Sequence, residues 1–313
     1  MRYRPLGQTG FHVSALSFGA SALGGVYGEA PEADSIRAVH AALDAGINYL
    51  DVSPYYGLTR AETVLGKALR GVPRDRYVIS TKAGRDGHDA FDMSPQHLQQ
   101  SLEASLVRLG LDSVDILLLH DVEFVPWRQV VEESLPTLRD FQRQGTIRWY
   151  GLTGFPLTVF NRIVAEQIPV DLILSYGHYA LHDRTLLDLL PALQARQIGV
   201  INASPFGMGL LTDQGPPAWH PAPTVIQQIC QQAAAYCRTQ GHSLAELAIQ
   251  FAVSQPTLAT TLFSACNPTE VEQTVRWAEE LPEEGLLQDV LSQLQPIQGQ
   301  SWPSGLPEYA SLQ

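Results

Sequence analysis

One βαβ unit decides the fold class of this chain, and it reads YVISTKAGRDGHDAFDMSPQHLQQSLEASLVRLGLDSVDILLLH over residues 77–120. Two short apolar runs, at residues 77–82 and 114–120, have the length and composition of buried strands. Between them, Ser94-Pro95 forms a helix N-cap followed by proline in the first turn, and Gly110 ends a stretch of leucines at helical spacing. The order of strand, helix and strand predicts a parallel sheet.

The same alternation of apolar runs and amphipathic helices recurs along the chain. We expect strands at residues 13–18, 47–52, 77–82, 114–120, 147–153, 171–175, 199–204 and 258–264. About eight such units in 313 residues favour a (β/α)8 TIM barrel over a doubly wound sheet, and no Gly-x-Gly-x-x-Gly pattern follows the first strand. We therefore predict an α/β chain in which residues 1–313 form a single barrel domain.

Three segments lie outside the repeating units. Residues 3–13, with a turn at Gly7-Gln8-Thr9-Gly10, predict a β-hairpin that caps the bottom of the barrel. The loops at residues 209–223 and 299–307 are rich in Pro and Gly and are too long for simple connections, so we interpret them as candidate lids over a site.

The composition limits the partners of the chain. Its formal net charge is −12, and it lacks the Lys and Arg clusters that hold nucleic-acid backbones. No apolar leader opens the sequence and no run approaches the ~18 apolar residues that span a bilayer, so we expect no membrane partner and a cytoplasmic location. Cys230, Cys237 and Cys266 lack metal-ligand spacing and are interpreted as free thiols. We expect a small-molecule substrate and a monomer or weak homodimer.

Four side chains with complementary proton-transfer chemistry fall at or just after the ends of predicted strands: Asp51, Tyr56, Lys82 and His120. The active sites of TIM barrels lie at these strand ends, so the fold would bring the four together. A phenol with a pKa of about 10 is a poor acid or base near neutral pH. A neighbouring ammonium stabilises its phenolate, and a carboxylate can hold that ammonium in place.

Each of the four residues also has an ordinary structural interpretation. Asp51 could cap a helix and Tyr56 could be a surface aromatic. Lys82 could be an exposed charge, and His120 could be a core histidine bonded to the backbone. Taken together, with the spacing Asp-x-x-x-x-Tyr-Gly, the four favour catalysis. We expect no metal site, because the other histidines are scattered without ligand spacing.

The order and context of these motifs resemble those of aldo-keto reductases over nearly the whole chain. Matching segments include residues 18–24, 51–57, 120–124, 151–154 and 302–305. Within that superfamily the pattern is most similar to plant-type L-galactose dehydrogenases. The resemblance implies NAD-dependent oxidation of an aldose at C1. It favours conversion of L-galactose to L-galactono-1,4-lactone, as in ascorbate biosynthesis.

The resemblance also implies a role for each of the four residues. Tyr56 would accept the proton of the anomeric hydroxyl while hydride leaves C1 for the nicotinamide. Lys82 would lower the pKa of Tyr56, and Asp51 would fix Lys82 by a charge-assisted hydrogen bond. His120 would hydrogen-bond the reacting oxygen and orient it.

Contacts to NAD are expected from the later strands. By resemblance, Thr153 and Ser175 would face the nicotinamide amide, and residues 204–210 would wrap the pyrophosphate with backbone N–H groups. The expected cofactor contacts are Thr153, Ser175, Asn202, Ser204, Phe206, Gly207, Gly209, Leu210, Ser264, Ala265, Cys266, Asn267 and Glu270. The expected substrate contacts are Tyr55, Asp121, Phe124, Trp127, Tyr179 and Trp302. Gly154 and Ala203 depart from the asparagine and the aromatic residue of many relatives.

NAD is expected rather than NADP. Relatives that use NADP pair its 2′-phosphate with a Lys or Arg after the last strand, whereas residues 264–275 contain no cation and include Glu270 and Glu272. Both acids could instead simply occupy the first turn of the last helix. Three alternatives stay open: another aldose such as L-fucose or D-arabinose, reduction of an aldehyde or ketone, and a cofactor-sensing regulatory module without turnover.

Overall fold

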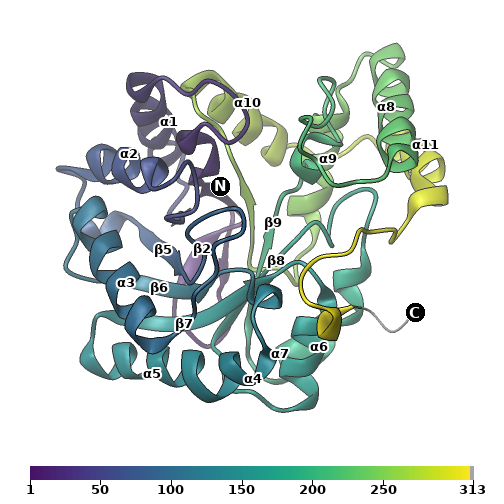
Figure 1. Ribbon diagram of the computed structural model, residues 1–313. Coiled ribbons are helices and arrows are strands. Elements are labelled where there is room, and N and C mark those ends of the chain that lie inside the picture. The colour runs from purple at the N-terminus through teal and green to yellow at the C-terminus, as the bar shows by residue number, and fades with distance from the viewer. Residues whose placement is uncertain (311–313) are drawn as a thin grey trace.

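Eight parallel strands close into a barrel in the computed structural model, which describes residues 1–310 (Figure 1). In ring order the strands are β10 (Thr260–Phe263), β3 (Leu16–Gly19), β4 (Tyr49–Asp51), β5 (Val78–Ala83), β6 (Val114–Leu119), β7 (Ile147–Gly154), β8 (Leu172–Tyr176) and β9 (Gly199–Ala203). β10 pairs in parallel with β3, which closes the ring. The predicted (β/α)8 TIM barrel is confirmed, and each expected strand overlaps one of the eight.

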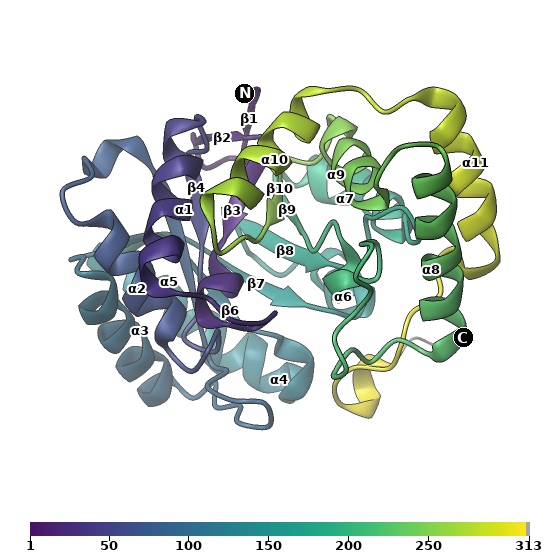
Figure 2. The same cartoon turned by 90° about the horizontal axis from the view of Figure 1, so that it is seen from above.

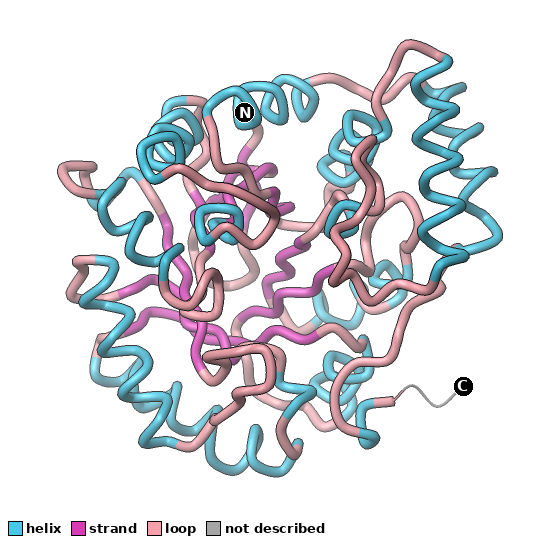
Figure 3. Tube along the Cα trace, turned by 45° about the horizontal axis from the view of Figure 1, so that its top comes forward, coloured by secondary structure: helices cyan, strands magenta, loops and turns pink. Residues whose placement is uncertain are grey.

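Helices surround the strands, as the cyan and magenta parts of Figure 3 show. They are α1 (Glu32–Asp44), α2 (Arg60–Leu69), α3 (Pro95–Leu109), α4 (Trp127–Gln129), α5 (Leu135–Gln144), α6 (Leu157–Ala165), α7 (Leu190–Ala195), α8 (Thr224–Thr239), α9 (Leu244–Ser254), α10 (Pro268–Glu279) and α11 (Glu284–Leu294). α8 and α11 lie side by side (Figures 1 and 2). No helix within residues 1–310 combines the length and apolar character needed to cross a bilayer.

Local signals place the helix ends where the sequence predicts them. In α3 the Ser94 hydroxyl oxygen accepts a hydrogen bond from the His97 N–H at 3.4 Å, which satisfies a free donor of the first turn. Gly110 ends the helix with φ of 69°, a left-handed conformation that glycine adopts readily. The βαβ unit therefore has the boundaries that its capping residues indicate.

The N-terminal segment forms the predicted hairpin, with β1 (Tyr3–Pro5) antiparallel to β2 (His12–Ser14). Its Leu6 and Val13 are fully buried and pack with the side chains inside the barrel. The Gln8 N–H donates to the Gln197 carbonyl at 3.1 Å, just before β9 begins. The hairpin therefore caps the bottom of the barrel, as predicted.

Alternate residues of each strand fill the barrel interior, because successive side chains of a strand point to opposite faces. The apolar interior residues of the barrel strands include Tyr49, Val78, Ile116, Leu118, Leu172, Leu174, Ile201 and Leu262. Asp51 lies two residues after Tyr49, and His120 lies two residues after Leu118. The same alternation therefore turns both polar side chains inward at the C-terminal ends of their strands.

We predict that Gly66→Ala in α2 destabilises the protein although alanine is the better helix former by about 1 kcal/mol. A Cβ atom at Gly66 would lie 2.2 Å from the Arg108 carbonyl oxygen, where α2 packs on the end of α3. We expect unfolding free energy to fall by about 1–3 kcal/mol in urea titrations. Lys67→Ala, at an exposed neighbouring position, is the control; equal stability of the two variants would contradict the packing argument.

Candidate active site

A buried ion pair lies at the C-terminal end of the barrel interior. The Lys82 ammonium donates to Asp51 Oδ2 at 2.6 Å and to the Val52 carbonyl at 3.0 Å, and both charged side chains are at most 3% exposed. The Ser80 hydroxyl donates to the other Asp51 oxygen at 2.6 Å. Hydrogen bonds on both charges offset the cost of removing them from water. The expected role of Asp51 in fixing Lys82 agrees with this geometry.

Tyr56 lies against this ion pair through the face of its ring. The Lys82 ammonium is 4.7 Å from the Tyr56 ring centroid, and the imidazole of His120 packs edge-on with ring centroids 5.7 Å apart. Burial, followed by the negative charges of Asp51 and Asp121, raises the pKa of Tyr56 well above its usual value. This direction corrects the expectation of a lowered pKa, because Lys82 is already paired with Asp51 and faces the ring.

His120 is held in place through one ring nitrogen. Its Nδ1 lies 2.9 Å from the Ser53 hydroxyl oxygen, which also accepts the Tyr55 N–H at 3.1 Å. Burial lowers the pKa of His120 to about 3, because the opposing effect of Asp121 is smaller and Lys82 acts in the same direction as burial. The imidazole is therefore neutral near pH 7. Nε2 has no hydrogen-bond partner within residues 1–310, so it is available to form a hydrogen bond with a ligand.

A second ion pair, which was not predicted from the sequence, lies beside the four residues. Arg85 forms a short hydrogen-bonded pair with Asp121, and its guanidinium lies 3.8 Å from the Tyr55 ring centroid. The Thr153 hydroxyl donates to Asp121 Oδ1 at 3.1 Å and accepts the Asp121 N–H at 2.9 Å. Asp121 Oδ2 is 3.8 Å from His120 Nε2. Arg85 lies three residues after Lys82, just beyond the end of β5, and this position could have indicated a second cation at the site.

Thr153 thus fixes Asp121, and its hydroxyl is already engaged at the position where a nicotinamide contact was expected. Tyr55 and Asp121 lie next to His120 and thus beside the tetrad, the name used here for Asp51, Tyr56, Lys82 and His120. Substrate contacts were expected from both residues. Phe124 stacks on Phe91 with ring centroids 4.3 Å apart, and the Arg85 guanidinium lies 5.8 Å from the Phe124 ring centroid. Phe124 therefore belongs to the same side of the barrel mouth.

The structure does not bring Trp127 or Tyr179 to the tetrad. Trp127 is buried against Tyr309, and its indole N–H donates to Glu166 at 2.8 Å. Tyr179 stacks on Phe251 of α9 with ring centroids 5.2 Å apart. Both side chains pack between outer elements of the barrel, so neither fits the expected role in substrate binding.

Strand alternation likewise turns Ser175 and Asn202 away from the interior. Ser175 lies between Leu174 and Tyr176, which both pack inside the barrel. Asn202 follows the interior residue Ile201, and its amide donates to a backbone carbonyl at 3.1 Å. Tyr176 is the residue of β8 that lies near the tetrad: burial and then the charge of Asp121 raise its pKa well above the usual value. Tyr176 was not predicted from the sequence.

The loop after β9, which was expected to bind the pyrophosphate, uses several of its backbone N–H groups in hydrogen bonds within the loop. The N–H groups of Gly207, Gly209 and Leu210 donate to the carbonyls of Ser204, Phe206 and Gly207 at 2.8, 3.1 and 3.2 Å. Three of the expected donors are thus already used. Ser204, Gly207, Met208 and Gly209 have positive φ values of 60°, 56°, 52° and 104°, so the loop turns tightly.

The residues that follow β10 form most of their hydrogen bonds with neighbouring parts of the chain. The Ser264 hydroxyl oxygen accepts the Ala22 N–H at 2.8 Å and thereby ties β10 to the loop after β3. Ala265 is 2% exposed, so it offers a ligand little beyond its backbone. Asn267 caps α10 by accepting the Glu270 N–H at 3.0 Å, and the Glu270 carboxylate accepts the Cys266 N–H at 3.0 Å.

The two loops interpreted as lids meet each other through aromatic contacts. Trp302 stacks on Phe155 with ring centroids 4.9 Å apart and packs edge-on against His220 at 5.1 Å. Trp219, next to His220, packs against Tyr27 with ring centroids 6.0 Å apart. Phe155 follows β7 and Tyr27 follows β3, and these strands lie opposite one another in the ring. We call this row of side chains the aromatic bridge; it links opposite sides of the barrel mouth.

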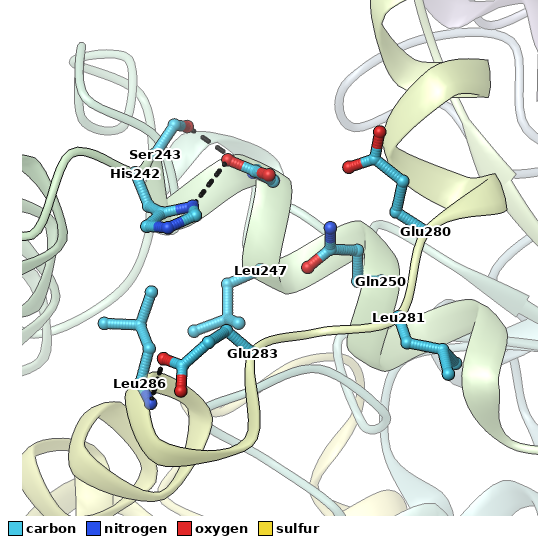
Figure 4. A pocket seen from close by; sticks show the side chains of 9 residues that line it. His242, Ser243, Leu247, Gln250, Glu280, Leu281, Glu283 and Leu286 are labelled. Carbon is cyan, nitrogen blue, oxygen red and sulfur yellow. Dashed lines mark hydrogen bonds and ion pairs between the residues drawn. The ribbon is translucent and has the colours of Figure 1, made fainter.

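A surface hollow elsewhere is separate from this mouth. It lies beside α9 and the segment that leads to α11, and His242, Gln250 and Glu283 are among its lining residues (Figure 4). His242 lies just before α9, and its Nδ1 is 3.4 Å from Oε2 of Glu246 in that helix. None of the expected site residues lines this hollow. The candidate active site is therefore the barrel mouth.

Known proteins resemble this chain over most of its length. A family model described as Aldo/keto reductase family matches residues 15–286. The chain is 43% identical over 311 residues to L-galactose dehydrogenase of Arabidopsis thaliana, with 97% of each chain covered. It is 34% identical over 257 residues to D-arabinose 1-dehydrogenase of Saccharomyces cerevisiae, with 78% of this chain and 76% of that protein covered. The resemblance inferred from the sequence motifs is confirmed.

Solved structures share the fold. An aldo-keto reductase from Bacillus halodurans in its holo form matches with a TM-score of 0.78 at 24% identity, over 99% of this chain and 100% of that chain. A glycerol dehydrogenase from Gluconobacter oxydans matches with a TM-score of 0.74 at 21% identity, over 97% and 98% of the two chains. At these identities the likeness shows the barrel alone.

We predict that His120 makes the protein less stable as the pH falls below about 6.5. The native imidazole stays neutral down to a pKa of about 3, whereas the unfolded chain takes up a proton, so acid favours unfolding. Between pH 6 and pH 5, urea titrations should show a loss of unfolding free energy larger by about 1 kcal/mol in the wild type than in His120→Asn. Parallel pH profiles would contradict a neutral buried imidazole.

Proposed function

Because this chain belongs to the aldo/keto reductase family, we propose that it is an NAD-dependent aldose 1-dehydrogenase that oxidises L-galactose to L-galactono-1,4-lactone. The family consists of oxidoreductases that use nicotinamide cofactors. One observation carries the proposal: the buried pair of Lys82 and Asp51 stands beside Tyr56 and His120 at the C-terminal ends of the strands. The names of two similar aldose dehydrogenases support this substrate class.

Tyr56 is the acid–base group of the proposed reaction. Its phenol carries a proton at neutral pH because its pKa is raised, and the negative charge of Asp51 opposes ionisation. Oxidation of a sugar needs the phenolate to accept the proton of the anomeric hydroxyl, so the oxidative rate should increase toward alkaline pH. The protonated phenol also favours the reverse direction, and reduction of an aldehyde or ketone is therefore the second candidate.

His120 and the pair of Arg85 and Asp121 would position the sugar. The unpartnered Nε2 of the neutral His120 can hydrogen-bond the reacting oxygen without adding a charge. Asp121 offers carboxylate acceptors and Arg85 offers guanidinium donors next to that oxygen, which suits a polyhydroxylated substrate. Each charge already has its partner, so the site can recognise hydroxyl groups without an unpaired buried ion.

The loops after β9 and β10 would hold the cofactor. Bound nicotinamide supplies the hydride chemistry. Residues 204–210 form the tightly turned loop after β9, and Ser264 and Asn267 lie in the loop after β10. Burial and the charge of Asp51 raise the pKa of Tyr56, so the pH at which its phenolate becomes available as a base is set by this chain's own residues.

Other expectations stay predictions. They are a cytoplasmic location, a monomer or weak homodimer, a single domain over residues 1–313 and a role in ascorbate biosynthesis. Steady-state rates with a panel of aldoses, including L-fucose and D-arabinose, would rank the substrates. Cofactor binding without turnover of any sugar, aldehyde or ketone would instead favour a regulatory module.

We predict that Tyr56→Phe lowers kcat for L-galactose oxidation by roughly 10²–10⁴-fold, because the change removes only the acid–base oxygen. The affinity for NAD, measured by quenching of intrinsic fluorescence, should stay near the wild-type value. Tyr55→Phe is the matched control, since its ring packs on Arg85 without being assigned proton transfer. A Tyr56→Phe variant with most of the wild-type rate would refute the assignment.

We predict a higher kcat/KM with NAD than with NADP at fixed sugar concentration. No cation lies in residues 264–275, and the Glu270 carboxylate is held at the start of α10 by the Cys266 N–H. A doubly charged 2′-phosphate would therefore meet a negative charge without an ion-pair partner. Equal or NADP-favouring values would overturn the preference.

A cation added at this helix start should raise NADP use. Thr269→Arg is the sharper variant, because Thr269 is exposed and the capping pair of Asn267 and Glu270 stays intact. Asn267→Arg adds the same charge but removes the N-cap of α10, which costs about 1 kcal/mol of stability. We expect both to raise kcat/KM with NADP more than they change it with NAD.

A further inference from the structure

Glu123 is a buried carboxyl group that joins two parts of the mouth. It lies in the short helix η3 (Val122–Phe124) after β6 and is 0% exposed. Its Oε1 accepts the Phe155 N–H at 3.0 Å and the Ser304 hydroxyl at 3.1 Å, and its carbonyl oxygen accepts the Leu306 N–H at 2.8 Å. We call residues 299–309 the C-terminal strap. Glu123 therefore binds both the end of β7 and the strap.

Two glycines let the strap and β7 approach this carboxyl group closely. A Cβ atom at Gly305, whose φ is +81°, would lie 2.4 Å from the Glu123 carbonyl oxygen and 2.6 Å from the Glu123 Cβ. A Cβ atom at Gly154 would lie 3.1 Å from Glu123 Oε2. The departure at Gly154 thus has a physical reason, since Glu123 occupies the space beside it. A side chain at Gly305 would collide with Glu123, and one at Gly154 would crowd Glu123 Oε2.

The second oxygen, Oε2, has no hydrogen-bond partner among residues 1–310 and is sealed from solvent. A carboxylate at this place would therefore be poorly compensated, whereas a neutral carboxylic acid costs much less to bury. Burial, followed by the charge of Asp121, raises the pKa of Glu123 to about 8. The other titratable groups around it are Tyr176 from β8 and Tyr309 from the strap. Arg85 is engaged by Asp121.

The strap carries Trp302, the central residue of the aromatic bridge. After Leu306 the strap returns toward α6, as the yellow segment in Figure 1 shows, and ends in the short helix η8 (Pro307–Tyr309). There the Tyr309 hydroxyl donates to the Val125 carbonyl at 2.9 Å, and the Thr158 hydroxyl donates to the Tyr309 carbonyl at 2.7 Å. The strap is also held at Gly299, whose N–H donates to the His182 carbonyl at 3.2 Å, and at Glu308, which pairs with Arg162 at 3.1 Å. Among these contacts, Glu123 supplies the buried carboxyl group.

We propose that Glu123 is a positioning residue that latches the C-terminal strap onto the barrel mouth in its protonated form and releases the strap when it ionises. Ionisation places a charge where Oε2 has no donor, so the contacts to Ser304 and Leu306 break and water reaches the carboxylate. Trp302 then loses its fixed position in the aromatic bridge. The effect on catalysis rests on the proposed aldose oxidation, whereas the opening of the strap does not.

Glu123→Gln separates the latch from the acid–base chemistry of Tyr56, because the amide keeps the size of a neutral acid and cannot ionise. In the wild type, KM for the aldose should rise on the order of tenfold between pH 7 and pH 9, as expected for one ionisation near pH 8. In Glu123→Gln, KM should stay flat, while kcat keeps the alkaline increase of the wild type. Glu308→Gln, which changes an exposed carboxylate of the strap that pairs with Arg162, should keep the pH dependence of the wild type.

A second measurement needs no substrate. Hydrogen exchange of the backbone amides of residues 299–309, normalised to the intrinsic rates at each pH, should show protection at pH 7 that is lost at pH 9 in the wild type and kept in Glu123→Gln. The same pH dependence in both proteins would overturn the latch. If the exchange result holds but no aldose is oxidised, the latch stands and the proposed function fails.

Ser304→Ala gives a further test should Glu123→Gln fold poorly. The Ser304 hydroxyl donates to the carboxyl group only while the strap is closed, so its loss weakens the closed, protonated state relative to the open, ionised state. The midpoint of the KM increase and of the loss of protection should both move to lower pH. An unchanged midpoint in both measurements would contradict the proposal.

Discussion

The organisation of the mouth depends on one buried ion pair, that of Lys82 with Asp51. Two charges inside a barrel are tolerated only when each is hydrogen-bonded, and here the Val52 carbonyl and the Ser80 hydroxyl complete the pair. Both carboxylate oxygens of Asp51 and the Lys82 ammonium are thereby engaged between β4 and β5. Tyr56 can pack its ring against the ammonium because that charge is already balanced.

The other polar groups of the mouth follow the same rule in different ways. Arg85 and Asp121 balance each other beside His120, and burial keeps that imidazole neutral. Glu123 has no cation left to pair with, because Arg85 is engaged by Asp121. Loss of its proton is therefore opposed by burial and by a neighbouring negative charge. The carboxyl group stays neutral at moderate pH and becomes a structural hydrogen-bond acceptor for the strap and the end of β7.

Much of the fold was predictable because its signals are local. The apolar runs give the strands, and Ser94, Pro95 and Gly110 give the ends of α3 through capping and backbone conformation. The barrel followed from the repetition of such units. The neighbourhood of the tetrad was also predictable, because the C-terminal ends of parallel barrel strands lie at one end of the barrel and alternation turns Asp51 and His120 inward.

The sequence by itself therefore determined the barrel, its hairpin cap and the residue types at the strand ends. Only the tertiary structure decided which residues reach the mouth and how their charges balance. A shift of one residue in a strand reverses the face of a side chain, so Tyr176 lies inside where Ser175 was expected. The partners of Arg85 and Glu123 come from segments far apart in the chain. The raised pKa of Tyr56 depends on burial and on charges that only the packed barrel brings together.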